Sequence, residues 1–103
     1  MIQAQLNLPK FTNNGKSTKK IHKQLEVELC SNFGGCTTFS GKNIKGKWLK
    51  NNKLYNDYLN IYQVAFDKKL KNLFIKIARK YGIETKQYAI YLVIDGQVKI
   101  INL

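Results

Sequence analysis

The apolar run from Leu54 to Phe66 constrains the fold of this chain more than any other segment. It is rich in Tyr, Ile and Val, which are residue types that favour β-strands. Apolar side chains fall on both faces of the predicted strand: Tyr58, Tyr62, Val64 and Phe66 on one, and Tyr55, Leu59, Ile61 and Ala65 on the other. The pattern does not tell which of the two faces meets the helices, but both faces must be covered.

Residues 1–9 predict a second strand, because apolar and polar residues alternate there until Pro9. A loop over residues 12–15 follows. A helix is then expected from Ser17 or Thr18, whose hydroxyl would cap it, to about Asn32. Its narrow apolar stripe consists of Ile21, Leu25 and Leu29.

The middle of the chain predicts short strands around a polar excursion. Residues 36–40 are β-branched and read as a strand, residues 41–47 as a lysine-rich excursion, and Trp48 and Leu49 as a resumed strand before a turn at 51–53. After the long strand, Asp67 is expected to cap a helix whose apolar residues recur at helical spacing, and Gly82 is expected to end it.

The last residues predict a hairpin, with strands over 87–94 and 98–103 joined by Asp95-Gly96. The predicted order is β-α-β-β-α-β-β, and its first six elements match the ferredoxin-like pattern of an antiparallel sheet with two helices on one face. We therefore expect an α+β fold in a single domain spanning residues 1–103. Two helices cover one face of such a sheet, so a homodimer or homotrimer is expected to cover the other.

Charge is the strongest indication of function. The 103 residues include 18 basic and 6 acidic side chains, for a net charge of +12, and seventeen of the basic residues are lysines. Such a surface attracts anions and indicates phosphate-bearing partners. With Arg79 as the only arginine, contacts to a nucleic-acid backbone are compatible with the composition, but reading of base edges is disfavoured.

Several classes of site find little support in the sequence. Cys30 and Cys36 match no zinc or redox spacing and are expected to be reduced thiols or, in an exported protein, a disulfide. The single histidine, His22, is expected to be exposed. No metal or cofactor is therefore predicted. No apolar run is long enough to span a bilayer and the N-terminus does not read as a signal peptide, which indicates a cytoplasmic protein without membrane partners.

Two segments could receive an anionic ligand. Gly15-Lys16-Ser17-Thr18 lies before a predicted helix but lacks the first glycine of a phosphate loop, so only a simple phosphate contact through Lys16 and Ser17 is expected. The alternative is a capped loop with solvated lysines. The second segment runs from Phe33 to Asp57.

That second segment combines flexible, hydroxyl, aromatic and basic residues. Gly34 and Gly35 permit close approach of the backbone, and Thr37 and Thr38 offer hydroxyls. Trp48 and Tyr55 could stack on a base beside Lys47 and the neighbouring lysines. The predicted ligand-binding residues are Gly34, Gly35, Thr37, Thr38, Lys47, Trp48, Tyr55, Lys16 and Ser17. The alternative is a helix exit, a core tryptophan and a solvated hairpin.

The spacing F-G-G-x-T, then G-x-W, then L-Y-x-D in this segment resembles that of small uncharacterised proteins of phages, plasmids and bacterial genomes. The resemblance covers residues 1–66 loosely. It implies the ferredoxin-like fold and an accessory protein of a mobile element, and it assigns no catalytic role.

The sequence therefore predicts a non-catalytic binder of a phosphate-bearing small ligand, such as a nucleotide or a nucleotide signal that a phage protein sequesters. A basic nucleic-acid-binding accessory protein is the first alternative. The others are an inhibitor that blocks another protein, and a small lyase or isomerase for which Asp57 and Tyr55 are the weak catalytic candidates.

Overall fold

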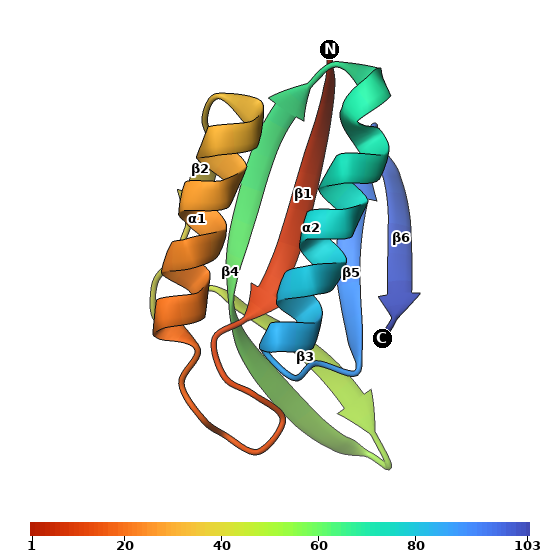
Figure 1. Cartoon of the computed structure of the whole chain (residues 1–103). Helices are drawn as coiled ribbons and strands as arrows, with labels where there is room; N and C mark the ends of the chain where they lie inside the picture. The colour runs from red at the N-terminus through yellow and green to blue at the C-terminus, as the bar shows by residue number, and fades with distance from the viewer.

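Two helices cover one face of a six-stranded sheet in the computed structural model, which describes all 103 residues (Figure 1). The elements follow in the order β1 (Ile2–Pro9), α1 (Lys19–Phe33), β2 (Thr37–Phe39), β3 (Lys45–Lys50), β4 (Lys53–Phe66), the 3₁₀ turn η1 (Lys68–Leu70), α2 (Lys71–Glu84), β5 (Ala89–Ile94) and β6 (Gln97–Asn102).

The sheet has the order β2-β4-β1-β5-β6, and β3 pairs with β4 outside this path. All pairs are antiparallel. Strand β1 lies in the centre, with Leu6 opposite Tyr62 of β4 on one side and opposite Leu92 of β5 on the other. This arrangement confirms the predicted α+β, ferredoxin-like fold with an added C-terminal strand.

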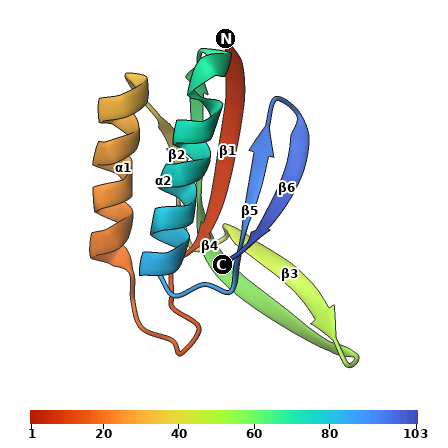
Figure 2. The same ribbon diagram turned by 45° about the vertical axis from the view of Figure 1, so that its right-hand side comes forward.

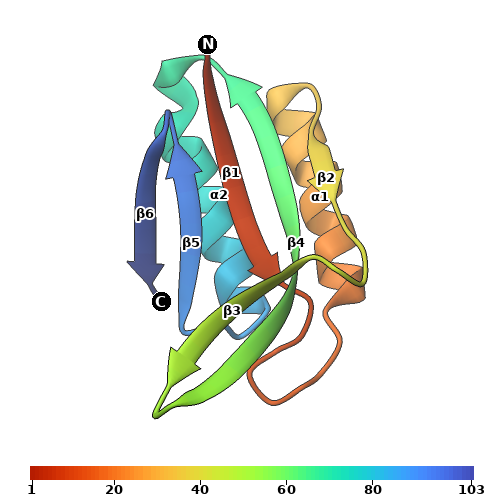
Figure 3. The ribbon, with the colours of Figure 1, turned by 180° about the vertical axis from the view of Figure 1, so that it is seen from behind.

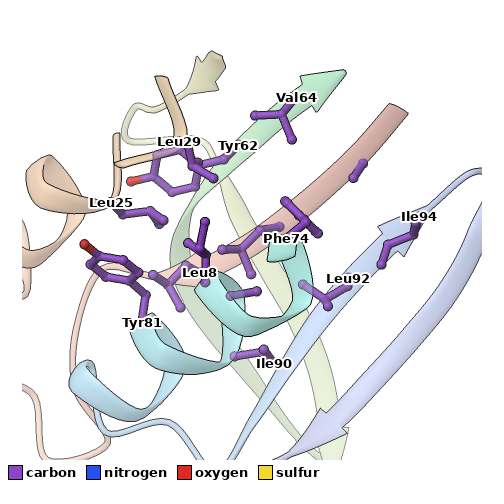
Figure 4. Packing of buried hydrophobic residues seen from close by; sticks show 14 of the residues in the cluster. Leu8, Leu25, Leu29, Tyr62, Val64, Phe74, Tyr81, Ile90, Leu92 and Ile94 are labelled. Carbon is purple, nitrogen blue, oxygen red and sulfur yellow. The ribbon is translucent and has the colours of Figure 1, made fainter. Parts of the chain in front are cut away.

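The core lies between the sheet and the helices (Figure 4). Every second residue of the central strands points into it, and Leu6, Leu8 and Leu92 are fully buried. Leu25 of α1 and Phe74 of α2 close this layer from the other side. Each such side chain contributes about 1.5–3 kcal/mol to folding when it leaves water.

His22 is buried, with only 5% of its surface exposed, so the prediction of an exposed histidine is wrong. Positions 22, 25 and 29 share one face of α1, and that face packs on the sheet. The ring Nε2 lies 2.8 Å from the carbonyl oxygen of Pro9, which can only accept, so Nε2 carries the proton. Nδ1 then accepts from the hydroxyl of Tyr62 at 2.5 Å.

The helix ends differ from the expectation in two places. The Thr18 hydroxyl donates to the carbonyl of Lys10 at 2.7 Å and therefore caps nothing in α1, whereas the Ser17 hydroxyl oxygen accepts from the N–H of Lys19 at 3.4 Å. Gly82 does not end α2, which continues to Glu84. A Cβ at position 82 would lie 2.6 Å from a methyl group of Ile90, so glycine allows the helix to approach β5. Asp67 does cap its helical turn, accepting from the backbone N–H of Lys69.

No helix has both the length and the apolar character needed to cross a membrane.

Strand β4 is longer than its neighbours, and its first half extends beyond the sheet as a hairpin with β3 (Figure 2). The hairpin closes on Asn51 and Asn52, both with positive φ, which gives the two-residue turn its twist. Residues 45–47 belong to β3, and the polar excursion predicted over 41–47 is therefore too long. Lysine side chains do not prevent a strand when its partner supplies the hydrogen bonds.

The sheet face opposite the helices is uncovered (Figure 3). Its central row consists of the amides Gln3, Gln5, Asn7 and Gln63, flanked by apolar and aromatic residues. The outward positions of β1, β2, β5, β6 and of residues 59–65 carry no charged side chain, although the chain has 24 charged residues. We call this the charge-free face.

The buried imidazole predicts a dependence of stability on pH. Burial, the main cause, lowers the pKa of His22 from its ordinary 6.5, so the unfolded chain binds the proton more readily than the folded one. Stability is therefore full above pH 6.5 and falls as the pH drops below it, by at most about 1.4 kcal/mol per pH unit. Urea unfolding between pH 7.5 and 5.5 should show this loss in the wild type. His22→Gln should flatten it, and parallel slopes would contradict the prediction.

Candidate functional site

A groove of about 560 Å³ opens between the β3–β4 hairpin and the lower edge of the sheet. One wall is the loop after β1, including Phe11, Thr12 and Asn13. The hairpin forms the second wall through Trp48 and residues 56–58, and residues 87–89 at the start of β5 form the third. The projecting hairpin in Figure 2 shows why segments so far apart in sequence meet here.

The lining of the groove is aromatic and nearly uncharged. Four aromatic residues line it, namely Phe11, Trp48, Tyr58 and Tyr88. Asp57 is its only charged residue, and none of the seventeen lysines lines it. Flat apolar surface with one carboxylate suits a planar ligand that is neutral or positively charged.

Trp48 and Tyr55 stand opposite each other in the hairpin and their rings stack, with centroids 4.6 Å apart and planes inclined by 18°. The indole Nε1 of Trp48 donates to the carboxylate of Asp57 at 3.1 Å. Stack and hydrogen bond together hold the indole in one orientation although it is 44% exposed. A fixed, exposed ring presents a surface for stacking without the loss of side-chain entropy that a free one would incur.

The loop wall is held in place by hydrogen bonds at both ends. The N–H of Lys10 donates to the carbonyl of Tyr58 at 2.8 Å, which ties the loop to the hairpin. On the other side, the Gln87 side chain donates to the carbonyl of Phe11 at 3.0 Å, and the Asn13 amide donates to the carbonyl of Lys86 at 2.5 Å. The groove is therefore formed before any ligand arrives.

The structure brings together only part of the predicted site. Trp48 and Asp57 line the groove, and Tyr55 supports Trp48 from behind. Lys47 pairs with Asn56 and lies on the other face of the hairpin from Trp48. Lys47 does not line the groove, so the phosphate contact predicted for it is not found there.

The glycine–threonine segment lies at the other end of the sheet. Thr37 and Thr38 pair with Gln63 and Tyr62, and eight residues of extended strand separate Gln63 from Tyr55, roughly 26 Å. Gly34 adopts a left-handed conformation, with φ 86°, and its N–H donates to the carbonyl of Cys30, which is the ordinary end of a helix. Gly35 follows in the same exit, away from the groove.

The remaining predicted residues lie in the loop before α1. Lys16 bonds back to Thr12 through its carbonyl, so it shapes the loop without facing the groove. Ser17 lines a different cavity, beside the start of α1.

The two cysteines are free thiols whose sulfur atoms lie 3.7 Å apart. Burial raises the pKa of the Cys36 thiol. No three His, Cys, Asp or Glu side chains gather as a metal site would need.

Sequence reasoning missed Phe11, Asn56, Gln87 and Tyr88 as groove residues. Tyr88 carried a usable signal, because it is an aromatic at the start of a strand and is 81% exposed. Phe11 and Gln87 could not be linked, since their contact joins positions 76 residues apart.

Comparison with known proteins finds the same fold in solved structures. A phage SAM lyase in its apo state matches with a TM-score of 0.71 and 10% sequence identity, over 99% of this chain and 89% of the lyase. A phage SAM lyase in complex with S-methyl-5′-thioadenosine matches with a TM-score of 0.70 and 9% identity over the same shares. No protein-family model and no curated protein sequence matches the chain. At this identity, the likeness shows the fold.

The exposed Trp48 predicts a small stability effect on substitution. Trp48→Ala removes an aromatic stack of about 0.5–1.5 kcal/mol and leaves the core intact. Leu6→Ala is the comparison, because it opens a cavity in the core and costs about 2–5 kcal/mol. Urea denaturation measures both. Unfolding of the Trp48 variant would show that the indole is a core residue and not a ligand surface.

Proposed function

We propose that the protein binds S-adenosylmethionine (SAM) in the groove beneath the β3–β4 hairpin and cleaves it as a lyase. The observation that carries the proposal is the lining of the groove, which has four aromatic residues, one acidic residue and no lysine. The match to a phage SAM lyase over 99% of the chain supports it, because the two proteins share one fold.

The chemistry of SAM fits this lining. Its adenine is a flat ring that stacks on aromatic side chains, for which Trp48 and Tyr88 are available. Its sulfonium is a cation, which aromatic faces attract by about 0.5–2 kcal/mol. The carboxylate of Asp57 supplies the opposite charge. The amide nitrogens of Asn13 and Gln87 hold the loop wall, which leaves their amide oxygens to accept from the ribose hydroxyls.

A phosphate-bearing ligand, which the sequence predicts, fits this particular groove poorly. A phosphate beside Asp57 would meet a like charge, and no lysine lines the groove to offset the repulsion. The lysines of the hairpin do not line the groove, so they attract anions elsewhere on the surface of the protein.

The proposed lyase reaction cleaves a bond of the sulfonium. When the bond between the sulfonium sulfur and the amino-acid chain breaks, both electrons stay on sulfur and S-methyl-5′-thioadenosine leaves as a neutral thioether. The carboxylate of the same amino-acid chain forms a bond to the carbon that sulfur leaves, so the second product is a lactone. Loss of positive charge weakens the hold of Asp57 on the product, which favours its release. We expect such a reaction to take place in the cytoplasm. The link to mobile elements stays a prediction.

Asp57→Asn tests the role of the carboxylate. We expect affinity for SAM to fall about tenfold, which corresponds to about 1.4 kcal/mol, and affinity for neutral S-methyl-5′-thioadenosine to change less than twofold. The substituted side chain still accepts from the Trp48 indole, so the hairpin keeps its shape. Calorimetry gives both affinities, and chromatography of SAM incubated with the protein gives the release of the thioether.

Glu84→Gln is the matched control, because it removes one negative charge from an exposed helix end outside the groove. It should leave binding and cleavage unchanged. Binding without release of the thioether would contradict the lyase step and leave a sequestering protein. An equal loss of both ligands in Asp57→Asn, or no binding at all, would contradict the groove as the site.

The proposal extends to a homo-oligomer joined through the charge-free face. Two copies that each carry a net charge of +12 repel one another. The charge-free face is a broad surface on which they can meet without bringing like charges together. Phe39, Val98 and Ile100 lie on it, at 44%, 58% and 67% exposure. Burial of these side chains between two copies provides the favourable free energy of association.

Ile100→Lys places a charge on the β6 edge of this face and should dissociate the oligomer. Light scattering after size exclusion should give a multiple of 11.9 kDa for the wild type and 11.9 kDa for the variant. Val27→Lys is the control, because Val27 is equally exposed but lies on α1. A wild-type monomer at tens of micromolar, or the same mass change in both variants, would refute this assembly.

A further inference from the structure

A second cavity, of about 570 Å³, lies on the other side of the loop after β1, beside the first turns of α1. Three lysines line it, Lys10 from the end of β1 and Lys19 and Lys23 from α1. Ser17 and Ser40 line it from two further segments. Its chemistry is therefore opposite to that of the hairpin groove, although Phe11 lies between the two and lines both.

None of these lysines forms a salt bridge. The one salt bridge of the molecule joins Lys80 to Glu28, so none of the three ammonium groups lies within 4 Å of a carboxylate. Lys19 and Lys23 are four residues apart on one helix, a spacing at which like charges destabilise the helix by about 0.2–0.5 kcal/mol. Glu26 is the only acid in the lining, so the cavity keeps an excess of two positive charges.

The floor of the cavity is rigid and neutral. His22 and Asn60 form it, and the histidine is fixed between the Pro9 carbonyl and the Tyr62 hydroxyl. The Asn60 amide donates to both Nδ1 of His22 and the oxygen of Tyr62, each at 3.2 Å. Lys10 is also restrained, because its Nζ donates to the carbonyl of Gly41 at 3.2 Å. The floor and Lys10 are therefore fixed in advance, whereas Lys19 and Lys23 are exposed and complete the rim from α1.

We propose that this cavity binds the phosphate group of a small molecule, with Lys10, Lys19 and Lys23 as its cationic partners and the hydroxyls of Ser17 and Ser40 as donors. A phosphate carries up to two negative charges and accepts several hydrogen bonds, which matches the two excess charges and two hydroxyls. The site is separate from the hairpin groove and does not depend on SAM binding there.

Pyrophosphate is the probe, titrated by calorimetry into the full chain at 150 mM salt. Lys19→Ala/Lys23→Ala should weaken its binding at least tenfold. The matched control is Lys68→Ala/Lys69→Ala, which removes the same charge at the opposite end of the molecule (Figure 1). Because screening acts beyond about 8 Å at this salt, the control should weaken binding less than twofold.

Equal weakening in the two variants would overturn the proposal and would show a diffuse attraction of the kind that nucleic-acid backbones exploit. Absence of pyrophosphate binding at millimolar concentration would overturn it as well. A SAM cleavage assay tests the proposed function independently of pyrophosphate binding. Neither Lys19 nor Lys23 lines the hairpin groove, so their substitution should leave cleavage unchanged.

Discussion

The alternation of side chains along β1 is the constraint on which the rest of the molecule depends. Leu6 and Leu8 point to the helices, and Gln5 and Asn7 to the opposite face. A slip of one residue against β4 would put amides into the core and leucines into water. Because β1 pairs on both sides, its register also sets which residues of β4 and β5 are inward, and thereby defines the charge-free face.

The length of β4 converts this layered fold into one with a groove. Residues 59–66 pair with β1 and belong to the sheet, whereas residues 53–58 pair only with β3. The hairpin therefore overhangs the edge where β1 ends and β5 begins, and the loop after β1 fills part of the gap. One continuous strand thus carries Tyr62 in the core and Asp57 in the groove, with no hinge between them.

Local periodicity predicted most of the fold, since strands and helices of this chain have regular apolar spacing. It succeeded for β1, α1, α2 and the Asp95-Gly96 turn, where Asp95 and Gly96 both have positive φ. The prediction from periodicity was wrong for His22. The sequence around a polar residue does not indicate a buried hydrogen-bond partner 40 positions away. The site was predicted in part: Trp48 and Asp57 are neighbours in one hairpin, whereas Tyr88 joins them through the fold.

Charge is distributed in this molecule by face. Lysines occupy the helices, the loops and the hairpin, while one broad sheet surface has none. The protein is therefore an electric dipole as well as a polycation. A charged surface orients the molecule as well as attracting it. On a negatively charged resin, we expect a single copy to adsorb through its helices, with its neutral sheet facing the solvent.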